Sequence, residues 1–142
     1  MKKLFFAVFA FVLLVACATP YKQAKKETAN GYFDTKLQEG MYEVIFNGNE
    51  NTSFAKANNF ALLRSAEVCL ENDYKSFDIV RKTEDFTEKD ADSGIKIFGG
   101  TLTDVVKSEP KITFLIRCSK AKDLPYKAEE LKNNLRAKYK LQ

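Results

Sequence analysis

The chain has 142 residues, of which 45% are hydrophobic and 30% are charged. This length and balance predict one globular domain and exclude the composition of a disordered chain, which combines low hydrophobicity with high net charge. The net charge of +4 is too small to indicate a nucleic-acid-binding protein. Because the chain has no His, it cannot use imidazole as a catalytic base or as a zinc ligand.

The first 16 residues have the pattern of an export signal. Lys2 and Lys3 form a basic start, and residues 4–16 form an uninterrupted apolar run. This run is shorter than the roughly 20 residues that a membrane-spanning helix needs. It ends in Leu14-Val15-Ala16-Cys17, which resembles the lipobox of bacterial lipoproteins.

The lipobox resemblance implies that Cys17 is the lipidation site. In that motif the Cys thiol receives a diacylglyceryl group, a peptidase cleaves just before the Cys, and the new amine receives a further acyl chain of the palmitate type. At about 0.8 kcal/mol per buried CH₂ group, two or three chains anchor a protein durably. Two alternatives stay open, namely an ordinary secretory signal with an incidental Cys and an uncleaved N-terminal anchor.

The residues after Cys17 predict where the protein is located. In the sorting rule for lipoproteins, Asp in the position after the Cys retains the protein in the inner membrane, whereas this chain has Ala18. We therefore expect a lipid-anchored protein that faces the periplasm from the outer membrane, with the inner membrane as the less favoured location. Residues 18–30 are polar and include Pro20, which predicts that 17–30 is a lipidated tether ahead of a single periplasmic domain, 31–142.

Apolar periodicity predicts the elements of that domain in chain order. Residues 31–40 form an irregular segment, and Met41–Asn47 alternates like a strand. A helix is predicted from Phe54 to about Asp73, because one sector of it gathers an apolar stripe. That stripe consists of Ala55, Asn59, Leu62, Leu63, Ala66, Cys69 and Leu70, and a weaker patch on another side consists of Phe54, Ala57, Ala61 and Val68.

Three further strands and a second helix complete the prediction. The strands cover 76–83, 95–106 and 111–118, with an acidic loop over 84–93 and a bend at Gly99-Gly100. A C-terminal helix follows Pro125. The resulting fold class is α+β, with an antiparallel sheet of about four strands, one long helix packed on a face, and the C-terminal helix.

Three segments of the domain carry a family resemblance. They are residues 31–37 (GYFDTKL), residues 42–49 (YEVIFNGN) with Thr52, and residues 62–67 (LLRSAE). Together they resemble a family of small proteobacterial lipoproteins with no assigned activity. Phe33 and Ser65 depart from the family pattern. The resemblance implies an envelope location and a fold of this class, but no chemistry.

Cys69 and Cys118 are predicted to form a disulfide. Cys69 lies on the apolar stripe of the long helix, and Cys118 is in phase with the core face of the last strand. Export places both residues in an oxidising compartment, and the lipid on Cys17 leaves an even number of thiols. The alternative is a pair of buried free thiols. A catalytic thiol is disfavoured, because no His is present to act as its base.

Residues 84–94 are rich in carboxylates, and Asp90, Asp92 and Gly94 resemble part of a calcium-binding loop. The EF-hand pattern fails, however, because Gly94 occupies a ligand position and Thr101 stands where the final Glu is required. We therefore expect a solvated loop, with adventitious Ca²⁺ binding as the alternative. The sequence predicts no metal site and no cofactor.

The C-terminal helix combines a narrow apolar seam with basic residues. The seam consists of Ala128, Leu131, Leu135 and Tyr139, and its spacing predicts docking on the domain or on a partner, with the basic side chains facing outward. The basic residues form a candidate interaction surface for an anionic envelope component, such as cell-wall polymer or lipid headgroups. They are Lys127, Lys132, Arg136, Lys138 and Lys140. The alternative is a solvated face.

These features favour a non-enzymatic, membrane-anchored envelope lipoprotein that acts as an interaction or structural module. Its partners would be the membrane, through the lipid, and an envelope protein or the cell wall. The alternative is a periplasmic module that binds a small ligand or a lipid in a groove near Gly99-Gly100. A hydrolase that uses carboxylates alone is disfavoured, because no Asp/Glu pair lies in a recognisable apolar setting.

Overall fold

The computed structural model describes residues 17–88 and 108–142. The predicted signal peptide 1–16, the predicted strand 95–106 with its Gly99-Gly100 bend, and the calcium-like residues 90–94 lie outside these ranges. The described chain forms one antiparallel sheet and two helices, which confirms the α+β class. The order of the strands in the sheet is β1-β2-β4-β3-β5.

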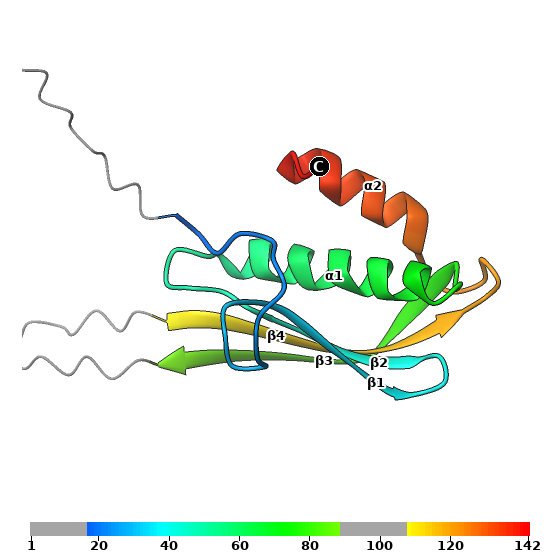
Figure 1. The fold of residues 1–142 in the computed structure, drawn as a ribbon, viewed down its shortest axis with the longest axis horizontal. Coiled ribbons are helices and arrows are strands. Elements are labelled where there is room, and N and C mark those ends of the chain that lie inside the picture. Colours follow the sequence, from blue (N-terminus) through cyan, green and yellow to red (C-terminus); the bar gives the residue numbers. More distant parts are fainter. Residues whose placement is uncertain (1–16, 89–107) are drawn as a thin grey trace, which may run out of the picture.

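The sheet, the long helix and the C-terminal helix form three successive layers (Figure 1). The strands are β1 (Gly31–Gln38), β2 (Met41–Asn47), β3 (Ser76–Glu88), β4 (Ser108–Ser119) and β5 (Tyr126–Lys127). Helix α1 (Phe54–Glu71) lies across one face of the sheet, and α2 (Ala128–Tyr139) lies on the side of α1 away from the sheet. Helix α1 is therefore covered on two sides.

The sheet is larger than the sequence predicted. Residues 31–38, expected to be irregular, form β1, which pairs with β2 from Gly31↔Asn47 to Gln38↔Met41. Strand β3 continues through Glu88 because β4 pairs with it up to Glu88↔Ser108, so the prediction of a loop is wrong for residues 84–88. Backbone hydrogen bonds hold these segments in the sheet, although their side chains do not alternate clearly between apolar and polar.

Helix α1 begins at a side-chain cap and is buried around most of its circumference. The Ser53 hydroxyl accepts a hydrogen bond from the Lys56 amide at 3.2 Å, which satisfies one free N–H of the first turn. Its buried residues include members of both predicted apolar sets, because the sheet and α2 cover different sides of the helix. They are Ala57, Phe60, Ala61, Leu63, Ser65, Ala66, Glu67, Val68 and Cys69. Ala55, assigned to the main stripe, is exposed.

A disulfide between Cys69 and Cys118 ties α1 to β4, as the sequence predicted. The two Cα atoms are 5.9 Å apart, within the usual range for a disulfide. Both cysteines are buried in the layer between helix and sheet, where Cys118 pairs across the ladder with Phe77. The cross-link therefore ties the C-terminal part of α1 to the C-terminal end of β4.

The apolar seam of α2 docks on the domain. Ala128 and Leu135 are buried, and Leu131 and Tyr139 pack partly buried against the core. The Tyr139 ring lies 4.9 Å from the ring of Phe60, measured between centroids, and its hydroxyl accepts a hydrogen bond from Asn59 Nδ2 at 2.8 Å. Of the two predicted possibilities, docking on the domain is the one that the structure shows.

Candidate functional site

The segment that contains Cys17 is attached to the domain almost from its first described residue. The Thr19 amide donates to Thr52 Oγ1 at 2.9 Å, and Thr19 Oγ1 accepts from the Asn49 amide at 2.7 Å. Asn49 Nδ2 also donates to the Cys17 carbonyl oxygen at 2.8 Å. Thr19 is buried, whereas Cys17 is exposed and has a free thiol. Cys17 is therefore exposed beside the loop between β2 and α1, to which its backbone is hydrogen-bonded.

The rest of this segment follows the edge of the sheet. The Ala24 amide donates to the Tyr32 carbonyl and the Tyr32 amide donates to the Lys22 carbonyl, both at 2.8 Å, so the segment pairs with β1. Gly31 adopts φ +122°, and a Cβ atom there would lie 2.4 Å from the Lys22 carbonyl oxygen. Only glycine permits this close approach. Residues 17–30, expected to be a tether, therefore lie against the domain from Thr19 onward.

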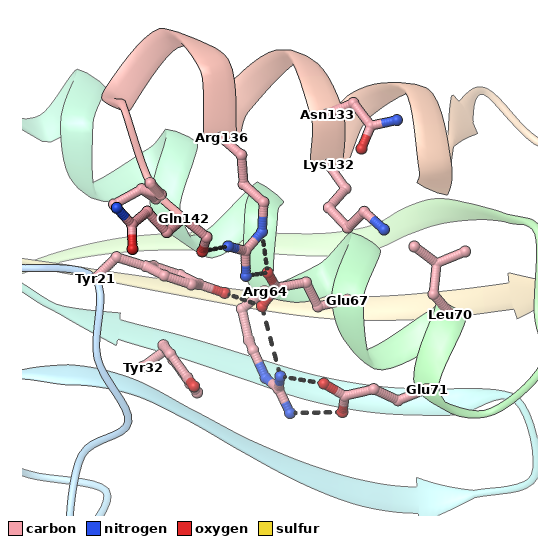
Figure 2. Close-up of a pocket in the computed structure, with 11 residues that line it drawn as sticks. Tyr21, Tyr32, Arg64, Glu67, Leu70, Glu71, Lys132, Asn133, Arg136 and Gln142 are labelled. Atoms are coloured by element: carbon pink, nitrogen blue, oxygen red, sulfur yellow. Dashed lines mark hydrogen bonds and ion pairs between the residues drawn. The ribbon is translucent and has the colours of Figure 1, made fainter.

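A hollow of about 840 Å³ opens between this segment, β1, α1 and the C-terminal end of the chain. Figure 2 shows it, with charged and aromatic side chains converging from all of these elements. Its lining residues are Tyr21, Tyr32, Arg64, Glu67, Leu70, Glu71, Lys132, Asn133, Arg136, Leu141 and Gln142.

Glu67 lies at the centre of a network that we call the Glu67 clasp, formed by Tyr21, Arg64, Glu67 and Arg136. The Glu67 side chain is only 9% exposed. Its Oε1 accepts from Arg136 Nε at 3.1 Å and from Arg136 Nη2 at 2.6 Å, while its Oε2 accepts from the Tyr21 hydroxyl. Arg64 Nη1 lies 3.6 Å from Oε2. The clasp therefore joins the N-terminal segment and α2 to α1 (Figure 2).

Arg64 extends the clasp to the edge of the sheet. Its Nε donates to Asp34 Oδ1 at 2.7 Å, and its two terminal nitrogens donate to the Glu71 carboxylate at 2.8 and 3.0 Å. The guanidinium also lies 4.8 Å from the centroid of the Tyr32 ring. Burial by itself lowers the pKa of Arg64, but the hydrogen bonds to Asp34 and Glu71 outweigh it and the pKa is raised. Arg64 is therefore a fixed positive charge that links α1 to β1.

Tyr21 makes the clasp sensitive to alkaline pH. Burial, followed by the hydrogen bond to Glu67, raises the pKa of the Tyr21 hydroxyl above its usual value of 10.0. Because the folded-state pKa is the higher one, this stabilisation is fully present below pH 10 and is lost as the pH rises above that value. The loss attributable to Tyr21 is about 1.4 kcal/mol per pH unit.

We expect Tyr21→Phe to lose less stability than the wild type between pH 10 and pH 12, since the variant has no hydroxyl to ionise at this position. Urea denaturation at a series of pH values measures the free energy of unfolding of both proteins. Tyr42, whose pKa burial also raises, is present in both and cancels in the comparison. Parallel pH profiles for the two proteins would contradict this role of Tyr21.

The basic residues of α2 do not all face outward. Arg136 turns into the clasp, so the prediction of an outward direction is wrong for this residue, because the buried Glu67 carboxylate draws it inward. Lys127 Nζ donates to the carbonyl oxygens of Lys122 and Leu124 at 2.7 and 2.6 Å. The charged groups of Arg136 and Lys127 therefore both bind to groups within the protein.

Of the other three basic residues, Lys132 lines the hollow, whereas Lys138 and Lys140 are exposed. Lys132 Nζ lies 3.1 Å from Glu129 Oε1 in an ion pair within the helix. The Lys138 ammonium lies 5.5 Å from the centroid of the Tyr139 ring, and Lys140 ends the helix in the left-handed conformation. The interaction surface available on α2 is therefore smaller than the five residues that the sequence predicted.

The sequence interpretation missed the Glu67 clasp. The one available signal was the position of Glu67 between Ala66 and Val68 in the most apolar part of the helix, which predicts burial of a charged group. A buried carboxylate requires a partner. Its partners Tyr21 and Arg136 lie 46 and 69 positions away in the chain, so the sequence did not identify them.

Comparison of the chain with protein-family models, with curated proteins and with solved structures found no match. Within residues 17–88 and 108–142, neither helix has the length and apolar character needed to span a membrane. Over the same ranges, no cluster of three or more His, Cys, Asp or Glu side chains is arranged to hold a metal ion.

Proposed function

We propose that this protein is a lipid-anchored envelope protein that faces the periplasm from the outer membrane and serves as a non-catalytic interaction or structural module. The observation that carries the proposal is the state of its three cysteines. Cys69 and Cys118 are joined in the core, whereas Cys17 is free and exposed. A disulfide is typical of an oxidising compartment, and the remaining thiol is the one that the lipobox resemblance assigns to lipid.

The arrangement around Cys17 supports lipidation of a folded domain. Cys17 is exposed, and the hydrogen bonds that hold Cys17 and Thr19 use their backbone groups and the Thr19 side chain. Modification of the Cys17 sulfur therefore breaks none of them. The lipid would emerge from a surface that is already ordered.

The charges of the domain support an interaction role. In the Glu67 clasp the carboxylate and both guanidinium groups have partners within the protein, which favours a structural role for this network. On α2 and at its C-terminal cap, the side chains of Lys138 and Lys140 remain exposed. They suit an anionic partner in the envelope, either another protein or the cell wall, through contacts that weaken as salt is added.

We expect Cys17→Ser to abolish lipid attachment, because a hydroxyl cannot form the thioether that carries the lipid. The variant should appear in the soluble fraction or accumulate as an uncleaved precursor, as measured by membrane fractionation and intact mass. Ala18→Ser is the matched control, and it should be lipidated normally. Ala18→Asp tests the location, since it should move the protein to inner-membrane fractions. Normal processing and membrane retention of Cys17→Ser would contradict the proposal.

The hollow supports a second candidate function, the binding of a small ligand. The Glu71 side chain is 55% exposed although it pairs with Arg64, and Lys132 lines the same hollow although it pairs with Glu129. A ligand with both charges would compete with these ion pairs. A short peptide with free amino and carboxyl groups has matching chemistry. The groove expected near Gly99-Gly100 lies outside the described residues, so the hollow is a different place from the one the sequence predicted.

We expect trialanine, used as a zwitterionic probe, to raise the melting temperature of the wild-type protein if the hollow binds such ligands. Lys132→Ala should remove the shift, because it deletes the cation that would pair with the probe carboxylate. Lys122→Ala, outside the hollow, is the control and should retain it. The absence of any shift with the wild type would exclude this function for peptides of that kind.

A further inference from the structure

Two phenylalanine rings, one exposed and one partly buried against the core, form an aromatic pair at one end of the domain. Phe86, on β3, is 61% exposed, and its ring centroid lies 4.6 Å from that of Phe54, the first residue of α1. Single exposed apolar side chains are common on soluble proteins. The location of this pair, rather than its exposure, makes it informative.

The aromatic pair lies at the end of the sheet from which Cys17 projects. Phe86 pairs across the ladder with Pro110, and the Pro110 carbonyl accepts from the Gly48 amide at 2.8 Å. Gly48 begins the loop that leads into α1, and Thr52 of this loop holds Thr19. Figure 1 shows the N-terminal segment leaving the domain at this end, beside the start of α1 and the far ends of β3 and β4.

The length of free chain between the lipid and the domain is very short. Cys17 is two residues from Thr19, and two extended residues span at most about 7 Å. Phe54 follows Thr52 by the same two residues, so its backbone lies within about another 7 Å of the Thr19 attachment point. A lipid on Cys17 therefore holds this end of the domain against the bilayer surface.

We propose that Phe54 and Phe86 contact the bilayer into which the Cys17 lipid inserts, so that the domain sits on the membrane in one orientation. This inference rests on the lipid anchoring proposed above. The rings are apolar, lie close to the anchor, and are positioned to enter the boundary between headgroups and acyl chains, where apolar faces of peripheral proteins are buried. Alternation along β3 directs the neighbouring Asp85 to the other face of the sheet.

In this orientation the membrane lies across the end where α1 begins, and the β1–β2 turn lies at the far end of the domain (Figure 1). The hollow lies along the side of the molecule, between these two ends. A partner in the periplasm would thus reach α2 and the hollow without displacing the bilayer. The aromatic pair would add a second contact with the bilayer and so limit rotation of the domain about its lipid anchor.

The absence of Trp from the chain permits a direct test. Phe86→Trp places a single fluorophore in the aromatic pair, and Leu37→Trp places one at the opposite end of the sheet, where Leu37 is 54% exposed. Each variant is expressed with its signal, purified from detergent-solubilised whole cells and mixed with phosphatidylcholine for reconstitution into vesicles with or without brominated acyl chains. Bromine quenches only a fluorophore that reaches the lipid.

We expect the emission of Phe86→Trp to be blue-shifted in vesicles and quenched several-fold more strongly than that of Leu37→Trp. Flotation of both variants with equal or no quenching would overturn the membrane contact while leaving lipid anchoring intact. Failure of both variants to float, with no acyl mass on Cys17, would overturn lipid anchoring and the membrane contact together. The two failures are therefore distinguishable in one experiment.

Discussion

Replacing Glu67 with Ala is expected to lower the free energy of unfolding by about 3 kcal/mol, since breaking a buried ion pair commonly costs 3–5 kcal/mol. We place the loss at the lower end of that range because the Arg136 side chain is 32% exposed, so water screens part of the interaction. The substitution also leaves the Tyr21 hydroxyl without its acceptor. Urea denaturation under non-reducing conditions measures the effect.

The matched control is Glu71→Ala, which removes a carboxylate from the same helix face. Because its side chain is 55% exposed, we expect a loss of about 1 kcal/mol or less. A double-mutant cycle of Glu67→Ala with Arg136→Ala isolates the coupling between the two residues. Equal, small losses for Glu67→Ala and Glu71→Ala would show that the clasp does not contribute to stability.

The position of the clasp determines which parts of the molecule respond to its loss. Tyr21 belongs to the segment that holds Cys17, and Arg136 belongs to α2, so Glu67 joins both ends of the domain to α1. Amide hydrogen exchange should therefore increase first in α2 and in residues 19–24, while the paired core of β2 and β4 stays protected. A joint increase in exchange would show that the stability of the N-terminal segment and the stability of α2 are coupled through Glu67.

The parts of the fold that could be predicted are those with a local apolar period. Strands β2 and β4 alternate between apolar and polar residues, and the apolar stripe of α1 includes Cys69, so the sequence pattern directs both Cys69 and Cys118 into the core. In these elements the polarity of each residue indicates whether its side chain faces the core or the solvent. The same local signal located α2 and its seam.

The parts that could not be predicted depend on partners distant in the chain. Strand β1 and the end of β3 are held by backbone hydrogen bonds to neighbouring strands, which any side chain permits. Thr19 is buried because Asn49 and Thr52, 30 and 33 positions away, form hydrogen bonds with it. A polar segment that is hydrogen-bonded to a domain can have the same composition as a free tether. Composition alone therefore led to the prediction of a tether for residues 17–30.

The Cys69–Cys118 disulfide is expected to be the largest single contribution to stability that a simple substitution can remove. The bond spans 49 positions of the chain, for which the chain-entropy model gives roughly 4 kcal/mol. Because a domain of this size is stable by only about 5–15 kcal/mol, that loss is a large fraction of the total. Cys69→Ala combined with Cys118→Ala should lower the urea midpoint, as should reduction of the wild type.

Thiol labelling distinguishes loss of the cross-link from damage to the core. In the denatured, non-reduced, lipidated protein no cysteine should react, because Cys17 carries lipid and the other two are bonded, whereas reduction should expose two thiols. Reducing agent should not further destabilise the double-alanine variant, since it has no bond to break. Labelling of both Cys69 and Cys118 before reduction would show that the bond is absent. In that case the stability of the domain would depend on apolar packing between α1 and the sheet together with the Glu67 clasp.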